Sequence, residues 1–173
     1  MEQLPLQDWQ MEIWGLVNMG KREFDYYVYI DYSDDLIGYV IIDNKGINIL
    51  LPKILRFRHY REARDKKLYL KNVKQTFKRE KLLDYFVQHK IRKTNQNIEI
   101  FLDIGEFIKT HSNCLIFASI DNKQYNSFQN FVKIVDGKNI KIIKESELKI
   151  GTAEYQISLV LDNWLNIERL KDE

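Results

Sequence analysis

The chain has 173 residues, 45% of them hydrophobic and 13% aromatic, with a net charge of +2, which is typical of one globular domain. Its single cysteine, Cys114, lies in an apolar run, which excludes a disulfide framework and a thiolate metal cluster. The N-terminus lacks the pattern of a secretory leader, and the apolar runs are far shorter than the ~20 residues of a membrane-spanning helix. We therefore expect a cytoplasmic protein with no membrane partner.

The first part of the chain predicts a short helix followed by three antiparallel strands. Residues 6–17 carry apolar side chains at helical spacing, so residues 1–20 are expected to hold an accessory helix. Residues 26–31, 36–42 and 46–51 are β-rich runs. Asp43-Asn-Lys-Gly46 reads as a turn between the last two runs, because glycine accepts a positive φ. These runs predict an antiparallel three-strand meander.

The second part of the chain predicts helices that alternate with parallel strands. Residues 60–95 are charged with helical spacing, and residues 98–109 fit a strand or an amphipathic helix, with flanking caps that favour the helix. The remaining expected elements are a strand at 114–121, a helix at 125–133, a strand at 139–144 and a helix from Thr152 to about Arg169. Parallel strands need helical crossovers, so this order predicts an α/β fold with a mixed sheet and flanking helices. We expect residues 1–173 to form a single domain.

Three aspartates follow this pattern of elements. Asp31 ends the first apolar strand, Asp121 ends the strand that begins at Cys114, and Asp162 lies in the last helix. The crossover order places the strands of Asp31 and Asp121 side by side. An ionised carboxylate at the end of an apolar strand is costly to bury unless a cation or a hydrogen bond compensates it. The set therefore indicates a cation site.

The order of elements and the placement of these acids resemble the ribonuclease H-like superfamily. Within it, Tyr29-Ile-Asp-Tyr-Ser-Asp-Asp35 resembles the opening motif of a family of uncharacterised domains that begin Tyr-Ile-Asp-Glu-Ser-Gly and end with an Asp-bearing helix. The chain departs from that motif at Tyr32, which replaces Glu, and at Asp34, which replaces Gly. Leu161-Asp162 replaces an Ala-Asp pair in the last helix.

The resemblance implies a nuclease that hydrolyses phosphodiester bonds of DNA or RNA by a two-metal mechanism with Mg²⁺ or Mn²⁺. Asp31 would bridge the ions, Asp121 would bind one of them, and Asp162 would close the site. Glu154 lies two turns before Asp162 on the same helical face, which makes it a candidate fourth acid. Asp34, or its neighbour Asp35, is a candidate replacement ligand.

A basic middle segment supports a nucleic-acid partner. Residues 53–93 contain fifteen Lys or Arg and four Asp or Glu, a net of +11, whereas the rest of the chain contains twelve and twenty-one, a net of −9. Aromatic residues interleave with these cations, as expected where phosphates are neutralised and bases stack. Because guanidinium groups suit phosphates, the candidate contacts are Arg56, Arg58, Arg61, Arg64 and Lys67.

Each of these features also has a purely structural interpretation. Asp121 fits the cap of the following helix, Asp34 fits a turn, and Asp162 fits an ion pair with Lys or Arg. The basic segment fits a solvated helical face. His59, His89 and His111 show no metal-ligand spacing and are expected at the surface. The alternative function is therefore a non-catalytic nucleic-acid-binding or protein-interaction domain on the same fold, with its oligomeric state left open.

Overall fold

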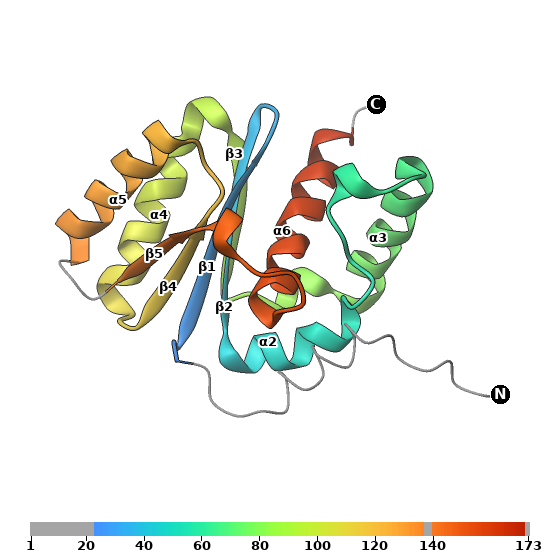
Figure 1. Cartoon of the computed structure of the whole chain (residues 1–173), viewed down its shortest axis with the longest axis horizontal. Helices are drawn as coiled ribbons and strands as arrows, with labels where there is room; N and C mark the ends of the chain where they lie inside the picture. Colours follow the sequence, from blue (N-terminus) through green and yellow to red (C-terminus); the bar gives the residue numbers. More distant parts are fainter. Residues whose placement is uncertain (1–22, 137–139, 172–173) are drawn as a thin grey trace.

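A computed structural model describes residues 23–136 and 140–171, in which a mixed five-stranded sheet forms the centre of the molecule (Figure 1). The strands are β1 (Tyr26–Ser33), β2 (Leu36–Asp43), β3 (Gln88–Lys93), β4 (Cys114–Ala118) and β5 (Lys141–Lys144), in the spatial order β3-β2-β1-β4-β5. β2 is antiparallel to both β1 and β3, whereas β1, β4 and β5 are parallel to one another. The predicted mixed sheet of antiparallel and parallel strands is confirmed, and β1 and β4 are neighbours as expected.

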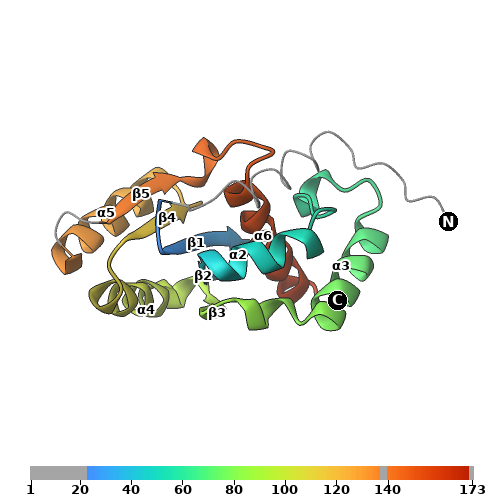
Figure 2. The ribbon, with the colours of Figure 1, turned by 90° about the horizontal axis from the view of Figure 1, so that it is seen from below.

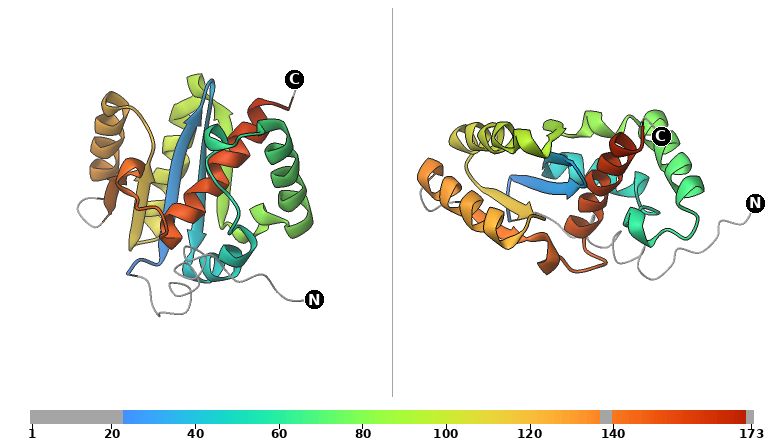
Figure 3. Two further views of the ribbon diagram at one scale, coloured as in Figure 1. Left: turned by 45° about the vertical axis from the view of Figure 1, so that its right-hand side comes forward. Right: turned by 90° about the horizontal axis from the view of Figure 1, so that it is seen from above.

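Helices cover both faces of this sheet. The α-helices are α2 (Asn44–Leu50), α3 (Lys66–Glu80), α4 (Asn97–Thr110), α5 (Asn122–Asp136) and α6 (Ala153–Arg169). Short 3-10 turns occur at η1 (Leu51–Lys53), η2 (Tyr60–Glu62), η3 (Leu82–Tyr85), η4 (Thr94–Gln96) and η5 (Glu145–Glu147). Figures 1 and 3 show α4 and α5 on one side of the sheet and α6 on the other, with α3 outside α6. None of the described helices combines the length and apolarity needed to cross a bilayer.

Each face of the sheet packs against its own hydrophobic core, and the two cores show to which side each residue of β1 points. Tyr27 and Tyr29 pack in the core beneath α6, whereas Val28 and Ile30 pack in the core beneath α4 and α5. Successive side chains of a strand point to opposite faces. Asp31, the next residue, therefore lies on the α6 side, where it is 9% exposed.

The segment predicted as the third strand is instead helix α2, which lies at the end of β2 (Figure 2). Asp43 Oδ1 accepts a hydrogen bond from the Gly46 N–H at 2.7 Å, so the expected turn is a helix N-cap. Gly46, Ile47 and Leu50 are buried with helical rather than alternating spacing. A Cβ at Gly46 would stand 2.8 Å from the Tyr85 carbonyl oxygen, so the close packing of this helix requires glycine.

The third strand of the meander is β3, within a segment predicted to be helical. β3 is an edge strand of polar side chains, so it lacks the alternating apolar pattern that identifies a half-buried strand. Lys90 pairs with Asp103 at 2.5 Å and with Glu99 at 3.2 Å, which attaches β3 to α4. The predicted helix within residues 1–20 lies outside the described residues, and the single-domain organisation stays a prediction.

Candidate functional site

The register of the sheet aligns three polar residues at the ends of the parallel strands. Ile30 pairs with Ala118, and Ala118 pairs with Lys144. The residues that follow them are Asp31, Ser119 and Glu145. Because Tyr29, Phe117 and Ile143, two residues earlier, all pack in the core beneath α6, the strand alternation directs the three polar side chains to the same side.

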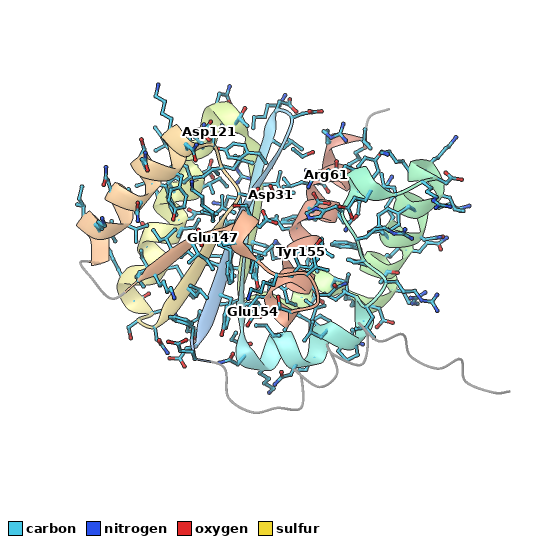
Figure 4. All side chains as sticks on the ribbon, viewed as in Figure 1. Asp31, Arg61, Asp121, Glu147, Glu154 and Tyr155 are labelled. Atoms are coloured by element: carbon cyan, nitrogen blue, oxygen red, sulfur yellow. The ribbon has the colours of Figure 1, made fainter. Side chains whose placement is uncertain are left out.

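Helix α6 adds a third acid to this group. Asp162 lines a pocket of about 720 Å³ together with Asp31, Ser119 and Glu145, and we call it the acid pocket. The same pocket is lined by three cationic side chains, namely those of Arg61, Lys66 and Arg169. Figure 4 shows Asp31 near the middle of the sheet, with Arg61 across α6 from it. Carboxylates and cations therefore share one concave surface.

Burial and mutual repulsion raise the pKa values of two of these acids. Burial raises the pKa of Asp31 well above its ordinary value, and the charges of Glu145 and Asp162 add to this shift. The Tyr32 N–H, 2.8 Å from Asp31 Oδ1, and the Ser119 hydroxyl act in the opposite direction. Burial also raises the pKa of Glu145, against the Ser119 hydroxyl and the charge of His59. A cation in the pocket would relieve this repulsion.

Asp162 is held by the chain segment that crosses above it. The Tyr60 N–H donates to Asp162 Oδ2 at 3.0 Å, and His59 Nδ1 lies 3.5 Å from Asp162 Oδ1. The bond to Asp162 raises the pKa of His59, although burial acts against it. His59 is only 17% exposed in its side chain, so the expectation of a surface histidine is wrong.

Residues 54–60, which we call the strap, are fixed from two sides. Gln156 of α6 donates to the Ile54 carbonyl oxygen at 2.7 Å and to that of Phe57 at 3.1 Å. Asn163, also of α6, donates to the Arg58 carbonyl oxygen at 2.9 Å. The Tyr69 hydroxyl of α3 donates to the same oxygen at 2.8 Å and accepts from the Arg58 N–H at 2.9 Å. The strap therefore has a defined position over the acid pocket.

The acid pocket offers carboxylate oxygens, the type of ligand that hard divalent cations prefer. Mg²⁺ and Mn²⁺ prefer carboxylate oxygens, and Asp31 and Glu145 present two carboxylates whose charges repel each other. Within residues 23–136 and 140–171, however, no three His, Cys, Asp or Glu side chains stand close enough together to hold an ion. Both oxygens of Asp162 already face the strap. Metal binding would therefore need a change at Asp162 or oxygens from a substrate.

Three of the predicted acids lie outside the acid pocket. Asp121 Oδ1 accepts from the Gln124 N–H at 2.8 Å and caps α5, and its side chain lines a neighbouring hollow of about 710 Å³. Asp34 pairs with Arg169 at 3.1 Å and is 72% exposed in its side chain. Glu154 belongs to the first turn of α6, and Figure 4 places it at the far end of that helix from the group around Asp31.

The predicted nucleic-acid contacts divide into separate groups. Arg61 lines the acid pocket, whereas Arg56 and Arg58 line a second pocket between the strap and α3. Arg64 and Lys67 are exposed and line neither of these two pockets. The five cations therefore do not line a single pocket.

Sequence reasoning missed Glu145, Ser119 and His59. Glu145 directly follows a predicted strand, the same signal that selected Asp31, so it could have been found. Ser119 has no signal of its own, because its importance comes from the register between β1, β4 and β5. His59 could not be assigned from spacing, since its partner Asp162 is about a hundred residues away.

No protein-family model matches the chain, and no curated protein matches it in sequence. The solved structures that are similar to it include two archaeal ones. The ribonuclease H2 from Pyrococcus horikoshii OT3 aligns with 86% of this chain and 76% of its own, at 18% identity and a TM-score of 0.41. The RNase HII in its complex with PCNA, from Archaeoglobus fulgidus, aligns with 85% of this chain and 75% of its own, at 13% identity and a TM-score of 0.43. Likenesses this loose say nothing about activity.

Proposed function

We propose that this protein is a divalent-metal-dependent nuclease that hydrolyses phosphodiester bonds in the acid pocket. One observation supports the proposal above all: Asp31, Glu145 and Asp162, from three different elements, face a single pocket that also carries cationic side chains. Neighbouring carboxylates that repel one another suit a divalent cation, and the cationic side chains suit the phosphates of a substrate.

The residues of the pocket divide this work between them. Asp31 and Glu145 would hold Mg²⁺ or Mn²⁺, which when bound activates water and stabilises the leaving oxygen. Arg61 and Lys66 would neutralise the phosphates of the substrate. His59 carries its proton to a higher pH than an ordinary histidine, because Asp162 stabilises the charged ring, so it is the candidate proton donor.

A second candidate function is nucleic-acid binding without catalysis. It is favoured by the contacts of Asp162, whose oxygens both face the strap and serve the fold as they stand. In this case Asp162 holds the strap and binds no ion. The number of ions, the choice between DNA and RNA and the cytoplasmic location stay predictions from the sequence.

The test is a cleavage assay with the full chain. End-labelled single-stranded DNA, single-stranded RNA, duplex DNA and an RNA–DNA hybrid would be incubated with Mn²⁺, Mg²⁺ or EDTA. We expect metal-dependent cleavage that Asp31→Asn and Glu145→Gln abolish. The matched control is Glu147→Gln, an exposed acid of the same 3-10 turn that lies outside the acid pocket, and it should retain activity.

Cleavage that persists in EDTA, or in Asp31→Asn, would show that the acid pocket is not responsible. A wild-type protein that binds the substrates and cleaves none of them in either metal would favour the non-catalytic function.

A further inference from the structure

The charged residues that line a second concave surface of the molecule are all basic. This surface is a pocket of about 630 Å³ bounded by η1, the strap and α3, and we call it the basic pocket. Its lining includes Lys53, Arg56, Arg58, Tyr69 and Arg79 and no Asp or Glu. Like charges that converge on a concave surface raise the local potential, so the pocket favours an anion.

Two of these cations are not neutralised by the protein. Lys53 pairs with Glu80 at 2.9 Å and Arg79 approaches the same carboxylate at 3.4 Å. In the described part of the chain, no ion pair is found for Arg56 or Arg58. Both are exposed at their side chains, so their guanidinium groups are available to a ligand.

The chemistry of the lining favours a phosphate group. A guanidinium group binds two phosphate oxygens with a rigid planar fork of donors, a geometry that a lysine ammonium lacks. The side-chain amides of Asn72 and Gln75 line the same pocket and offer neutral N–H donors. The Arg58 guanidinium carbon lies 5.4 Å from the centre of the Tyr69 ring, which is a cation–π contact.

The strap connects this pocket to the acid pocket. Arg58 lines the basic pocket, and the next two residues, His59 and Tyr60, line the acid pocket. Asn163 and Tyr69 fix the backbone at Arg58, and Asp162 fixes it at Tyr60. The distance between the two pockets is therefore set by rigid contacts and not by a free loop.

We propose that the basic pocket binds a backbone phosphate of the same nucleic-acid strand that enters the acid pocket, so that Arg56 and Arg58 position the substrate. The inference rests on the proposed function for the nature of the strand. It assigns binding to these two arginines and not to the lysines of α3, because Lys74 and Lys78 line a different hollow, beside Trp164.

The test measures binding in EDTA, where cleavage plays no part. Fluorescence anisotropy would follow a labelled 20-nucleotide DNA and the matching RNA over a range of salt concentrations. The test variant is Arg56→Gln with Arg58→Gln, and the matched control is Lys74→Gln with Lys78→Gln, which removes the same charge from α3. The affinity of the wild type falls as salt rises. We expect the plot of log affinity against log salt to be less steep in the test variant, by about 0.7 to 0.9 for each phosphate that the arginines no longer neutralise. The control should keep the wild-type slope.

A charge-conserving variant separates positioning from net charge. Arg56→Lys with Arg58→Lys should keep most of the salt slope and still bind more weakly than wild type, because an ammonium lacks the fork. Thermal unfolding of each variant would verify that the fold is intact.

A wild-type slope in the glutamine variant, or an equal loss in the Lys74 and Lys78 control, would overturn the inference. The inference would also be overturned if inorganic phosphate stabilised the protein against heat only when Arg56 and Arg58 are present, while the affinity for the oligonucleotides did not depend on these arginines. That outcome would indicate a site for free phosphate. A protein that binds as expected and cleaves nothing would leave this inference standing and remove only the proposed catalysis. Cleavage and binding that are both indifferent to the two arginines would remove only this inference.

Discussion

Replacing Asp31 by asparagine should make the metal-free protein more stable at neutral pH. Asparagine has nearly the same shape, and its Oδ1 can keep the bond from the Tyr32 N–H. The substitution removes a buried charge that faces Glu145 and Asp162. Because burial and these charges raise the pKa of Asp31 in the folded state, its contribution to stability is complete below the ordinary aspartate pKa of about 3.9. That contribution is lost as the pH rises through the raised value.

The size of the effect follows from the same linkage. Each unit by which the folded pKa is raised corresponds to about 1.4 kcal/mol at a pH above both values. For a chain of this length, 1 kcal/mol changes the melting temperature by roughly 2 to 4 °C. Thermal unfolding by circular dichroism between pH 4 and pH 8, in EDTA, would measure the gap between Asp31→Asn and wild type.

We expect this gap to be smallest at pH 4 and to widen as the pH rises. The matched control is Asp35→Asn, an acid of the β1–β2 turn that is 66% exposed in its side chain and lies outside the acid pocket. Mn²⁺ should stabilise the wild type and not Asp31→Asn, which narrows the gap. A less stable Asp31→Asn at neutral pH, or a gap that does not change with pH, would refute the reasoning.

Three further substitutions test the surrounding contacts. Asp121→Ala should cost about 1 kcal/mol, because it removes the cap of α5, and should leave cleavage unchanged in the same assay; lost cleavage with an intact fold would return Asp121 to the site. Gln156→Ala should lower the free energy of unfolding, measured in urea, by about 1 to 3 kcal/mol for each of the two strap carbonyls that lose their donor. A change below about 0.5 kcal/mol, which is usual for surface substitutions, would mean that water replaces the amide. Asp162 raises the pKa of His59, so this histidine contributes stability that is complete below its ordinary pKa of about 6.5 and is lost as the pH rises through the raised value. The difference in the free energy of unfolding between wild type and His59→Gln should therefore shrink between about pH 6 and pH 8. A difference that grows over this range would contradict the role of Asp162.

The sequence predicted most of the fold because the relevant signals are local. The apolar runs of β1, β2 and β4 and the Thr152 cap of α6 lie where the pattern placed them, and the Thr152 hydroxyl accepts from the Tyr155 N–H at 3.2 Å. The two elements whose type the sequence predicted wrongly, α2 and β3, both pack against segments elsewhere in the chain. α2 is helical because a cap at Asp43 and tertiary packing override a β-rich composition. β3 is a strand because β2 offers an edge, which a charged sequence does not reveal.

The candidate site was harder to predict because it depends on register. Asp121 lies two residues beyond Ser119, and that offset takes it past the end of β4, where it caps a helix. Glu145 lies at the end of β5, directly in line with Ser119, so the sheet supplies an acid from the strand beyond the one that the resemblance implied. The register between β4 and β5 shows that Glu145, and not Asp121, is in line with Ser119. That register cannot be derived from a single sequence.

Asp162 connects the stability of the fold to the chemistry of the pocket. Its carboxylate accepts from the Tyr60 N–H and lies against His59, so the strap and the acid pocket are not independent. A cation that took an oxygen of Asp162 would compete with the strap for it, and the strap also carries Arg58 at the basic pocket. A strand bound by Arg56 and Arg58 would, in turn, bias the strap and with it the availability of Asp162. Metal affinity and substrate affinity should therefore be coupled, and by linkage each should change the other by the same factor.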